Sequence, residues 1–187
     1  GDVSGYIIND RGEDDLSRKR KNIEPPDNMR GMFNFWHRHY LPEHWQLTLE
    51  STYLSDENFL EAFRRTDYLS KNKSRETSVH LRWLKDNQAF ALLGRWRIND
   101  WADQLEDLPS AQYHLTGQSL LDDKLTLYSD SMLGRFRQRT GKDHDLNIKD
   151  EYFTFGSHRT EIDFPLQYTT GNIVPFMAGT FGFDDRS

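Results

Sequence analysis

Three histidines near the start of the chain have side chains and a spacing that could suit a metal site. His37 and His39 are two residues apart, so on a β-strand their side chains share a face, and His44 follows after a short turn. A transition-metal site needs three or four converging ligands, and local spacing adds only Glu43. We therefore interpret these histidines as side chains near an interface or a lumen, and assign no metal site.

Acidic residues and possible nucleophiles give equally little specific chemistry. Asp56 with Glu57, and Asp103 with Glu106 and Asp107, could offer oxygen ligands to calcium, but solvated loop carboxylates are the simpler interpretation. The chain has no G-x-S-x-G nucleophile elbow, although a triad assembled from distant residues stays open. We predict no catalytic, cofactor-binding or metal-binding residues, no cofactor, and a protein that is not an enzyme.

The composition excludes several classes of protein. There are 24 Lys and Arg against 30 Asp and Glu, and the net charge of -6 disfavours a nucleic-acid partner. Without cysteine there is no disulfide scaffold and no thiolate metal site. No apolar run approaches the ~20 residues of a transmembrane helix. Because the start has neither an initiator Met nor a signal peptide, we expect a processed chain or a piece of a longer one.

Apolar residues are too few for an ordinary soluble core, yet the chain is rich in aromatic residues. The hydrophobic fraction is 35%, whereas 13% of residues are Phe, Trp or Tyr. Disordered chains are poor in aromatic residues, so this one is expected to fold.

The main structural signal is alternation of apolar and polar residues with a period of two, which indicates strands. It is clearest around Leu47 and Leu49, around Val79 and Leu81, and around Ile162 and Phe164. We predict an all-β, antiparallel up-and-down meander of about ten strands. The expected strands are 3–9, 30–40, 45–54, 77–85, 89–98, 112–121, 124–130, 147–156, 159–168 and 172–183.

The connections between these strands alternate between tight and long. Tight turns are expected at 41–44, at Asp86-Asn87, at Asp122-Asp123 and near Ser157-His158, and longer polar stretches lie between them. Transmembrane β-barrels have short periplasmic turns and long extracellular loops. We therefore predict a partial transmembrane β-barrel with apolar rows toward lipid. The rows are Leu47 and Leu49, Val79 and Leu81, Leu92 and Trp96, Leu115, and Ile162 and Phe164.

The opposite face of the predicted sheet is charged, as a barrel lumen may be. Its expected members are Glu50, Arg82, Arg95, Arg97, Glu161 and Asp163, while Tyr40, Trp45, Tyr53 and Trp83 are candidates for aromatic girdles. A soluble β-sandwich binding module and a generic outer-membrane porin or channel remain alternatives. The orientation of strand 30–40 stays open. After Leu127 the odd positions continue as Ser129, Ser131 and three arginines, so either a bulge changes the facing of the strand or, more simply, the strand has left the membrane. Pro165 and Pro175 imply a bulge, a strand end or loose pairing.

Two segments resemble a known family. The first consists of Arg30-Gly31-Met32-Phe33-Asn34-Phe35-Trp36-His37 and, after the turn, His44-Trp45-Gln46-Leu47-Thr48-Leu49-Glu50. The second, which is the more specific, is Tyr53-Leu54-Ser55-Asp56-Glu57-Asn58-Phe59-Leu60-Glu61-Ala62-Phe63. The chain is similar to an internal part of the C-terminal β-barrel of the LptD, or organic-solvent-tolerance, family. Residues around Asp86-Asn87, Leu108-Pro109, Leu115-Thr116 and 159–166 follow in the order and spacing of later family strands.

The resemblance implies a location in the outer membrane of a Gram-negative-type bacterium and a role in lipopolysaccharide transport. It implies that residues 1–187 are one segment of the barrel domain of a longer chain. Implied partners are lipopolysaccharide, membrane lipid, an LptE-like plug lipoprotein and periplasmic bridge proteins. The family's jellyroll, paired cysteines and seam strands have no counterpart here, so no site residue is carried over.

Overall fold

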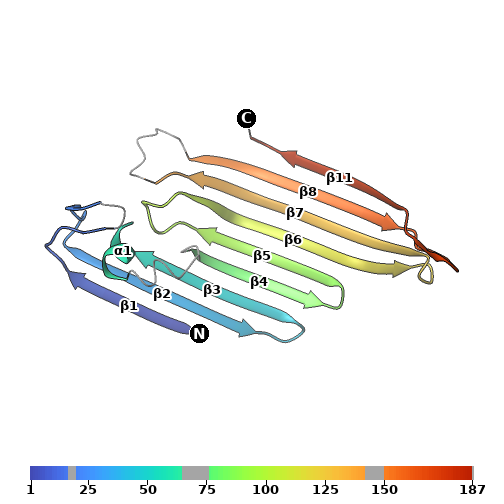
Figure 1. Cartoon of the computed structure of the whole chain (residues 1–187), viewed down its shortest axis with the longest axis horizontal. Coiled ribbons are helices and arrows are strands. Elements are labelled where there is room, and N and C mark those ends of the chain that lie inside the picture. The colour runs from blue at the N-terminus through green and yellow to red at the C-terminus, as the bar shows by residue number, and fades with distance from the viewer. Residues whose placement is uncertain (17–19, 65–75, 142–149, 187) are drawn as a thin grey trace.

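The computed structural model describes residues 1–16, 20–64, 76–141 and 150–186. Nine strands form one antiparallel sheet, and each lies beside its neighbour in chain order (Figure 1). These strands are β1 (Asp2–Asn9), β2 (Met29–Tyr40), β3 (Trp45–Leu54), β4 (Thr77–Lys85), β5 (Gln88–Trp96), β6 (Gln104–Leu120), β7 (Leu125–Arg139), β8 (Glu151–Asp163) and β11 (Phe176–Asp184). One short helix, α1 (Phe59–Phe63), and a small hairpin of β9 (Leu166–Tyr168) and β10 (Gly171–Ile173) complete the described structure.

Side chains are sorted between the two faces of this sheet by the pairing register. Leu47 pairs with Leu81, and Leu81 pairs with Leu92, so the three leucines share one face. Leu54 pairs with Met32 on the opposite face, where α1 packs against both. The predicted apolar rows therefore lie together on the face away from α1, except Phe164, which follows the end of β8.

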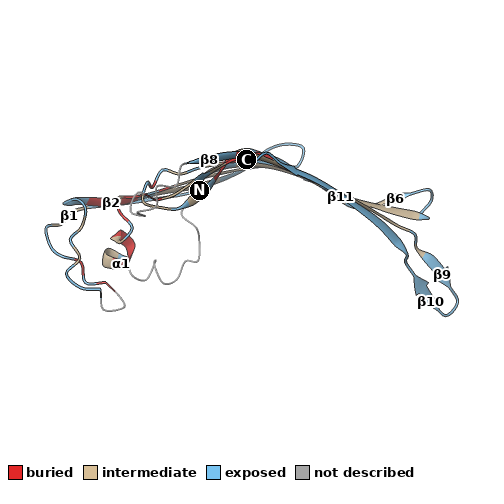
Figure 2. Cartoon of the chain, turned by 90° about the horizontal axis from the view of Figure 1, so that it is seen from above, coloured by how far each residue is buried: buried red, intermediate tan, exposed pale blue. Residues whose placement is uncertain are grey.

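The sheet is an open arch rather than a closed barrel. Figure 2 shows its curvature and places α1 on the concave side, so the apolar rows lie on the convex side. Among the described residues no ladder joins β1 to β11, which form the two edges. No second sheet covers the convex rows among these residues, so the two face-to-face sheets of a sandwich are not present in this part of the chain. The antiparallel meander is confirmed, and closure is not seen.

The register also orients the two strands that the pattern left open. In β2 the even residues from Arg30 to Tyr40 share the concave face with Leu54, and His37 and His39 share the convex face with Leu49 and Leu47. Strand β7 pairs with β8 without a shift from Thr126 to Gln138. No bulge therefore changes the facing of β7, and Ser129 and Ser131 stay on the convex side.

The predicted strand bounds were wrong in several places. Two of the predicted strands, 159–168 and 172–183, are interrupted in the structure at residues 164–165 and 174–175. The expected turn at Ser157-His158 lies inside β8, so residues 151–163 form one strand where we predicted two, and residues 147–149 lie outside the described residues. Strand β6 begins at Gln104 inside a predicted loop, and β7 continues to Arg139. The long and short connections do not alternate throughout, because residues 164–175 include the β9–β10 hairpin at the end where short turns were expected. Pro165 and Pro175 flank that hairpin, outside the long strands.

A close approach between two strands makes Gly31 the most sensitive glycine of the β1–β2 hairpin. A Cβ atom at Gly31 would lie 2.7 Å from the carbonyl oxygen of Tyr6, whereas one at Gly5 would lie 3.7 Å from that of Met32. We expect Gly31→Ala to lower the free energy of unfolding by about 1–3 kcal/mol, because the backbone must shift. Gly5→Ala should be neutral or slightly stabilising, because alanine lowers the conformational entropy of the unfolded chain. Urea unfolding of the full-length protein compares them, and equal effects would contradict the predicted strand contact.

Candidate functional site

The end of the sheet at which β1 and β3 end is called the loop end. On the concave side of this end, a fully buried arginine joins two loop segments. The guanidinium group of Arg30 donates two hydrogen bonds to Asp56, with Nη2 at 2.8 Å and Nε at 3.0 Å. Its Nη1 atom lies 2.7 Å from Asp14 and 3.4 Å from Asp10. The side chain of Arg30 is 0% exposed, and those of Asp14 and Asp56 are each 4% exposed. A buried cation thus meets three carboxylates from two loops.

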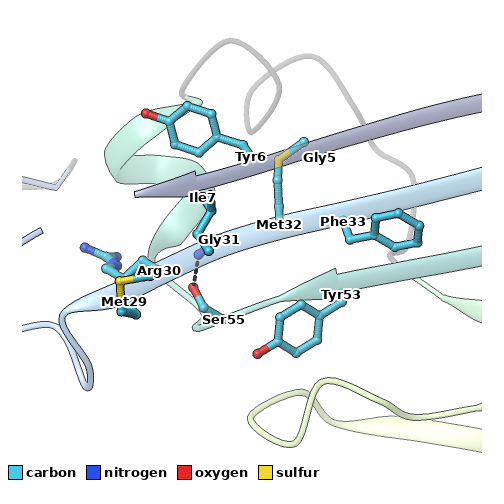
Figure 3. Close-up of a pocket in the computed structure, with 10 residues that line it drawn as sticks. All are labelled: Gly5, Tyr6, Ile7, Met29, Arg30, Gly31, Met32, Phe33, Tyr53 and Ser55. Carbon is cyan, nitrogen blue, oxygen red and sulfur yellow. Dashed lines mark hydrogen bonds between the residues drawn. The ribbon is translucent and has the colours of Figure 1, made fainter. Parts of the chain in front are cut away.

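An apolar cluster covers this arginine. Met32 and Leu54 from the sheet pack with Phe59 and Leu60 of α1. The ring of Phe63 lies under the guanidinium carbon of Arg30 at 4.9 Å. Figure 3 shows Tyr6 and Met32 on one side of the sheet and the hydrogen bond from the backbone N–H of Gly31 to Ser55, whose length is 3.1 Å.

The arrangement ties two loop segments to the concave face near the loop end. Asp14 and Leu16 belong to the connection between β1 and β2, and Asp56 and α1 follow β3. Arg20 joins the two segments by an ion pair of 2.5 Å with Glu61. Because the contacts are buried, the segments form a structured cap over part of the concave surface rather than free loops.

Asn99 extends the same region across the sheet. Its side-chain amide donates to the carbonyl oxygen of Thr52 at 2.9 Å and its carbonyl accepts from the backbone N–H of Leu54 at 2.8 Å. These groups of β3 lie beyond the last β4 pair, Glu50 with Ser78. The side chain of Asn99 thus makes, with these two groups, the hydrogen bonds that a neighbouring strand makes elsewhere in the sheet.

Charged residues continue along the concave face below this cap. Arg82 donates to Gln46 at 3.1 Å, and Arg95 lies between Asp107 at 2.7 Å and Glu76 at 3.1 Å. The register places Glu50, Arg82, Arg95, Glu161 and Asp163 on this face, as the sequence predicted. Arg97 is different, because it follows the end of β5. Burial lowers the pKa of the Arg97 guanidinium, and the positive charge of Arg139 acts in the same direction.

The residues first considered for metal binding have other partners or no converging ligands. His37 and His39 stack with ring centroids 6.0 Å apart. Among the described residues no group of three or more His, Asp or Glu side chains could hold a metal ion. Asp56 binds Arg30, Asp107 binds Arg95, and Glu106 binds Arg137. Asp103 accepts a hydrogen bond from the backbone N–H of Gly141.

Sequence reasoning did not identify the Arg30 network. Arg30 is 16 residues from Asp14 and 26 residues from Asp56, so no local spacing connects the three. The sequence shows only that Arg30 lies in a predicted strand next to Gly31, and this does not indicate which residues Arg30 contacts.

Removing Arg30 should release the cap. Arg30→Met leaves Asp14 and Asp56 buried without their cation, and we expect it to cost about 3–5 kcal/mol of stability. Arg159→Gln is the control, because Arg159 is 50% exposed and surface pairs contribute about 0–1 kcal/mol. Unfolding of the full-length protein, with protease cleavage between residues 55 and 64, measures both effects. A second substitution, Asp56→Asn, should recover part of the loss, and an unchanged Arg30→Met protein would contradict the network.

Comparison with known proteins adds the family. Among the described residues no helix has the length and apolar character to cross a bilayer. No curated protein and no solved structure matches the chain. The family model described as LPS transport system D matches residues 28–179, which include β2 to β8 and the cap residues from Arg30 to Phe63. This is a family of transport and assembly proteins rather than of enzymes. The chain belongs to the LptD family of lipopolysaccharide transport proteins.

Proposed function

We propose that this chain forms part of the barrel wall of an outer-membrane translocon that delivers lipopolysaccharide to the outer leaflet. It acts as one segment of the barrel domain of a longer protein in a Gram-negative-type bacterium. Its partners there are lipopolysaccharide, an LptE-like plug lipoprotein and periplasmic bridge proteins. The family match supports the substrate, and the partners are those of the intact protein.

The observation that carries this proposal is the sorting of side chains between the two faces. Leu47, Leu81 and Leu92 line up across three strands on the convex face, with no second layer over them among the described residues. A wall between lipid and an aqueous lumen needs an apolar outside and tolerates a polar inside. The concave face supplies the polar side with Arg82, Arg95 and their partners.

Aromatic side chains at both ends of the convex face also fit a membrane wall. Near the short turns, Trp45 lies 6.4 Å from Trp83 and 6.2 Å from Phe90, measured between ring centroids. At the loop end, Tyr53 and Trp96 lie on the same face. Such rings favour the two interfaces of a bilayer.

An arginine on the convex face should test the membrane assignment. Leu81→Arg near the middle of β4 should cost about 2–4 kcal/mol in lipid, because it places a charge in hydrocarbon. The neighbouring Arg82 points to the concave face, so Arg82→Gln should cost much less. Unfolding of the full-length protein in lipid vesicles measures both. Equal costs would argue against a convex face in lipid.

Depletion of the full-length protein in its host tests the transport role. We expect lipopolysaccharide at the cell surface to fall as the protein is lost, because delivery to the outer leaflet stops. Surface labelling of lipopolysaccharide gives the measurement, and re-expression of the protein is the control. An unchanged surface level would refute the transport proposal. Large single-channel conductance of the purified barrel without a plug would favour a porin instead.

A further inference from the structure

The convex face carries an apolar groove of about 530 Å³ near the loop ends of β4, β5 and β6. Gly94 forms part of its floor, and because Gly94 has no side chain, the ring of Trp96 lies directly over it. Leu93 pairs with Ser110 and Arg95 with Asp107, so two residues of β6, Leu108 and Pro109, stand opposite Gly94 and β6 has one extra residue there. The groove is lined by Leu47, Val79, Leu81, Leu92, Gly94, Trp96, Leu108 and Pro109.

A row of arginines lies beside this groove on the same face. Arg135, Arg137 and Arg139 occupy alternate positions of β7, in line with Leu133. Leu133 pairs with Ala111 and Phe136 pairs with Asp107, so Arg135 stands across from the bulge of β6. Arg135 and the β6 residues of the groove wall therefore lie on adjacent strands; Figure 1 shows β6 and β7 side by side.

The arginines differ in how firmly they are held. Arg137 binds the buried carboxylate of Glu106 and donates to the hydroxyl of Tyr152 at 2.6 Å. Arg135 is 47% exposed, and its partner Asp185, at 3.2 Å, is 48% exposed. Arg139 lies 3.3 Å from Asp150, which is 40% exposed, and 4.0 Å from Glu106. Of these, only the pair of Arg135 with Asp185 is well exposed on both sides. Such a pair contributes little to stability, and its carboxylate can be exchanged for another anion.

We propose that this groove and Arg135 form an outward-facing binding site for lipopolysaccharide. One acyl chain lies in the groove beside the ring of Trp96, against Leu81 and Leu92. A phosphate of the sugar head binds Arg135, with Arg139 beside it. Arginine suits this role because its planar donors match phosphate oxygens. The site rests on the proposed function, which supplies both the lipid and the orientation of the wall.

Lipopolysaccharide is the occupant that charge and position favour. The groove is apolar and continuous with the apolar rows of the convex face. The arginines lie at the loop end of the sheet, the same end as α1. In a transmembrane barrel the longer loops are extracellular, so this end faces the outer leaflet. Trp96 in the groove wall and Tyr152 beside Arg137 are side chains that favour the level of lipid head groups. A polar peptide would leave the groove unfilled.

Site-specific photocrosslinking in cells expressing the full-length protein tests this site. A photoreactive amino acid replaces Leu133, which is 55% exposed and lies two residues from Arg135 on the convex face. We expect a crosslinked adduct with lipopolysaccharide, detected by immunoblot. Arg135→Gln should reduce the adduct roughly tenfold, as expected for the loss of a charge-assisted hydrogen bond. Arg159→Gln is the matched control, because Arg159 is 50% exposed and faces the concave side.

A second variant tests the acyl part of the site. A Cβ atom at Gly94 would lie 2.7 Å from the ring of Trp96, so Gly94→Ala should displace that ring and reduce the adduct several-fold. The proposal is overturned if no lipopolysaccharide adduct forms, if both arginine variants change it equally, or if the adduct is a phospholipid. Surface lipopolysaccharide after depletion is measured separately. If no adduct forms but surface lipopolysaccharide still falls when the protein is depleted, this site is rejected and the proposed transport function is not.

Discussion

The alternation of side chains along each strand is the constraint on which the rest of this structure depends. The main sheet is a single layer among the described residues, so each residue of a strand faces one of two surfaces. Soluble β-sandwiches bury one surface against a second sheet about 10 Å away. Here Ile7 and Leu133 remain 73% and 55% exposed on the convex face. An apolar surrounding would make such a surface favourable, and this is the physical basis of the proposed barrel wall.

The buried contacts lie where this single layer receives a cover. Phe59 is 0% exposed, and the cluster around it contains two residues from the sheet and two from α1. An isolated buried charge is costly, so Arg30 is tolerated there because Asp14 and Asp56 surround it with hydrogen bonds. The same contacts fix two chain segments that have little other regular structure. At the loop end, the apolar cluster and the ion pairs of Arg30 together hold this cover on the concave face.

The sequence predicts an element of this fold well where the residues that determine it are close together in the chain, and poorly where they are far apart. Strands β3 to β5 were predicted closely, because Asp86-Asn87 marks a tight turn between clear alternations. The start of β6 was missed because Glu106 and Asp107 are typical of a loop, and in the sheet they pair with Arg137 and Arg95. Ser157-His158 was interpreted as a turn, although His158 lies within β8 and contacts Ser131 of the neighbouring strand. The cap could not be predicted, since the partners of Arg30 lie in distant loops.

A polar patch on the convex face follows the same logic as the cap. The hydroxyl of Ser131 lies 2.8 Å from Nδ1 of His158, and Nε2 of His158 lies 2.8 Å from the hydroxyl of Thr160. These groups face the side that we assign to lipid, where an unpaired polar group costs several kcal/mol. Because they bond to one another, most of that cost is avoided. Alternation therefore decides which surface a residue meets, and pairing across strands decides whether a polar residue is tolerated on it.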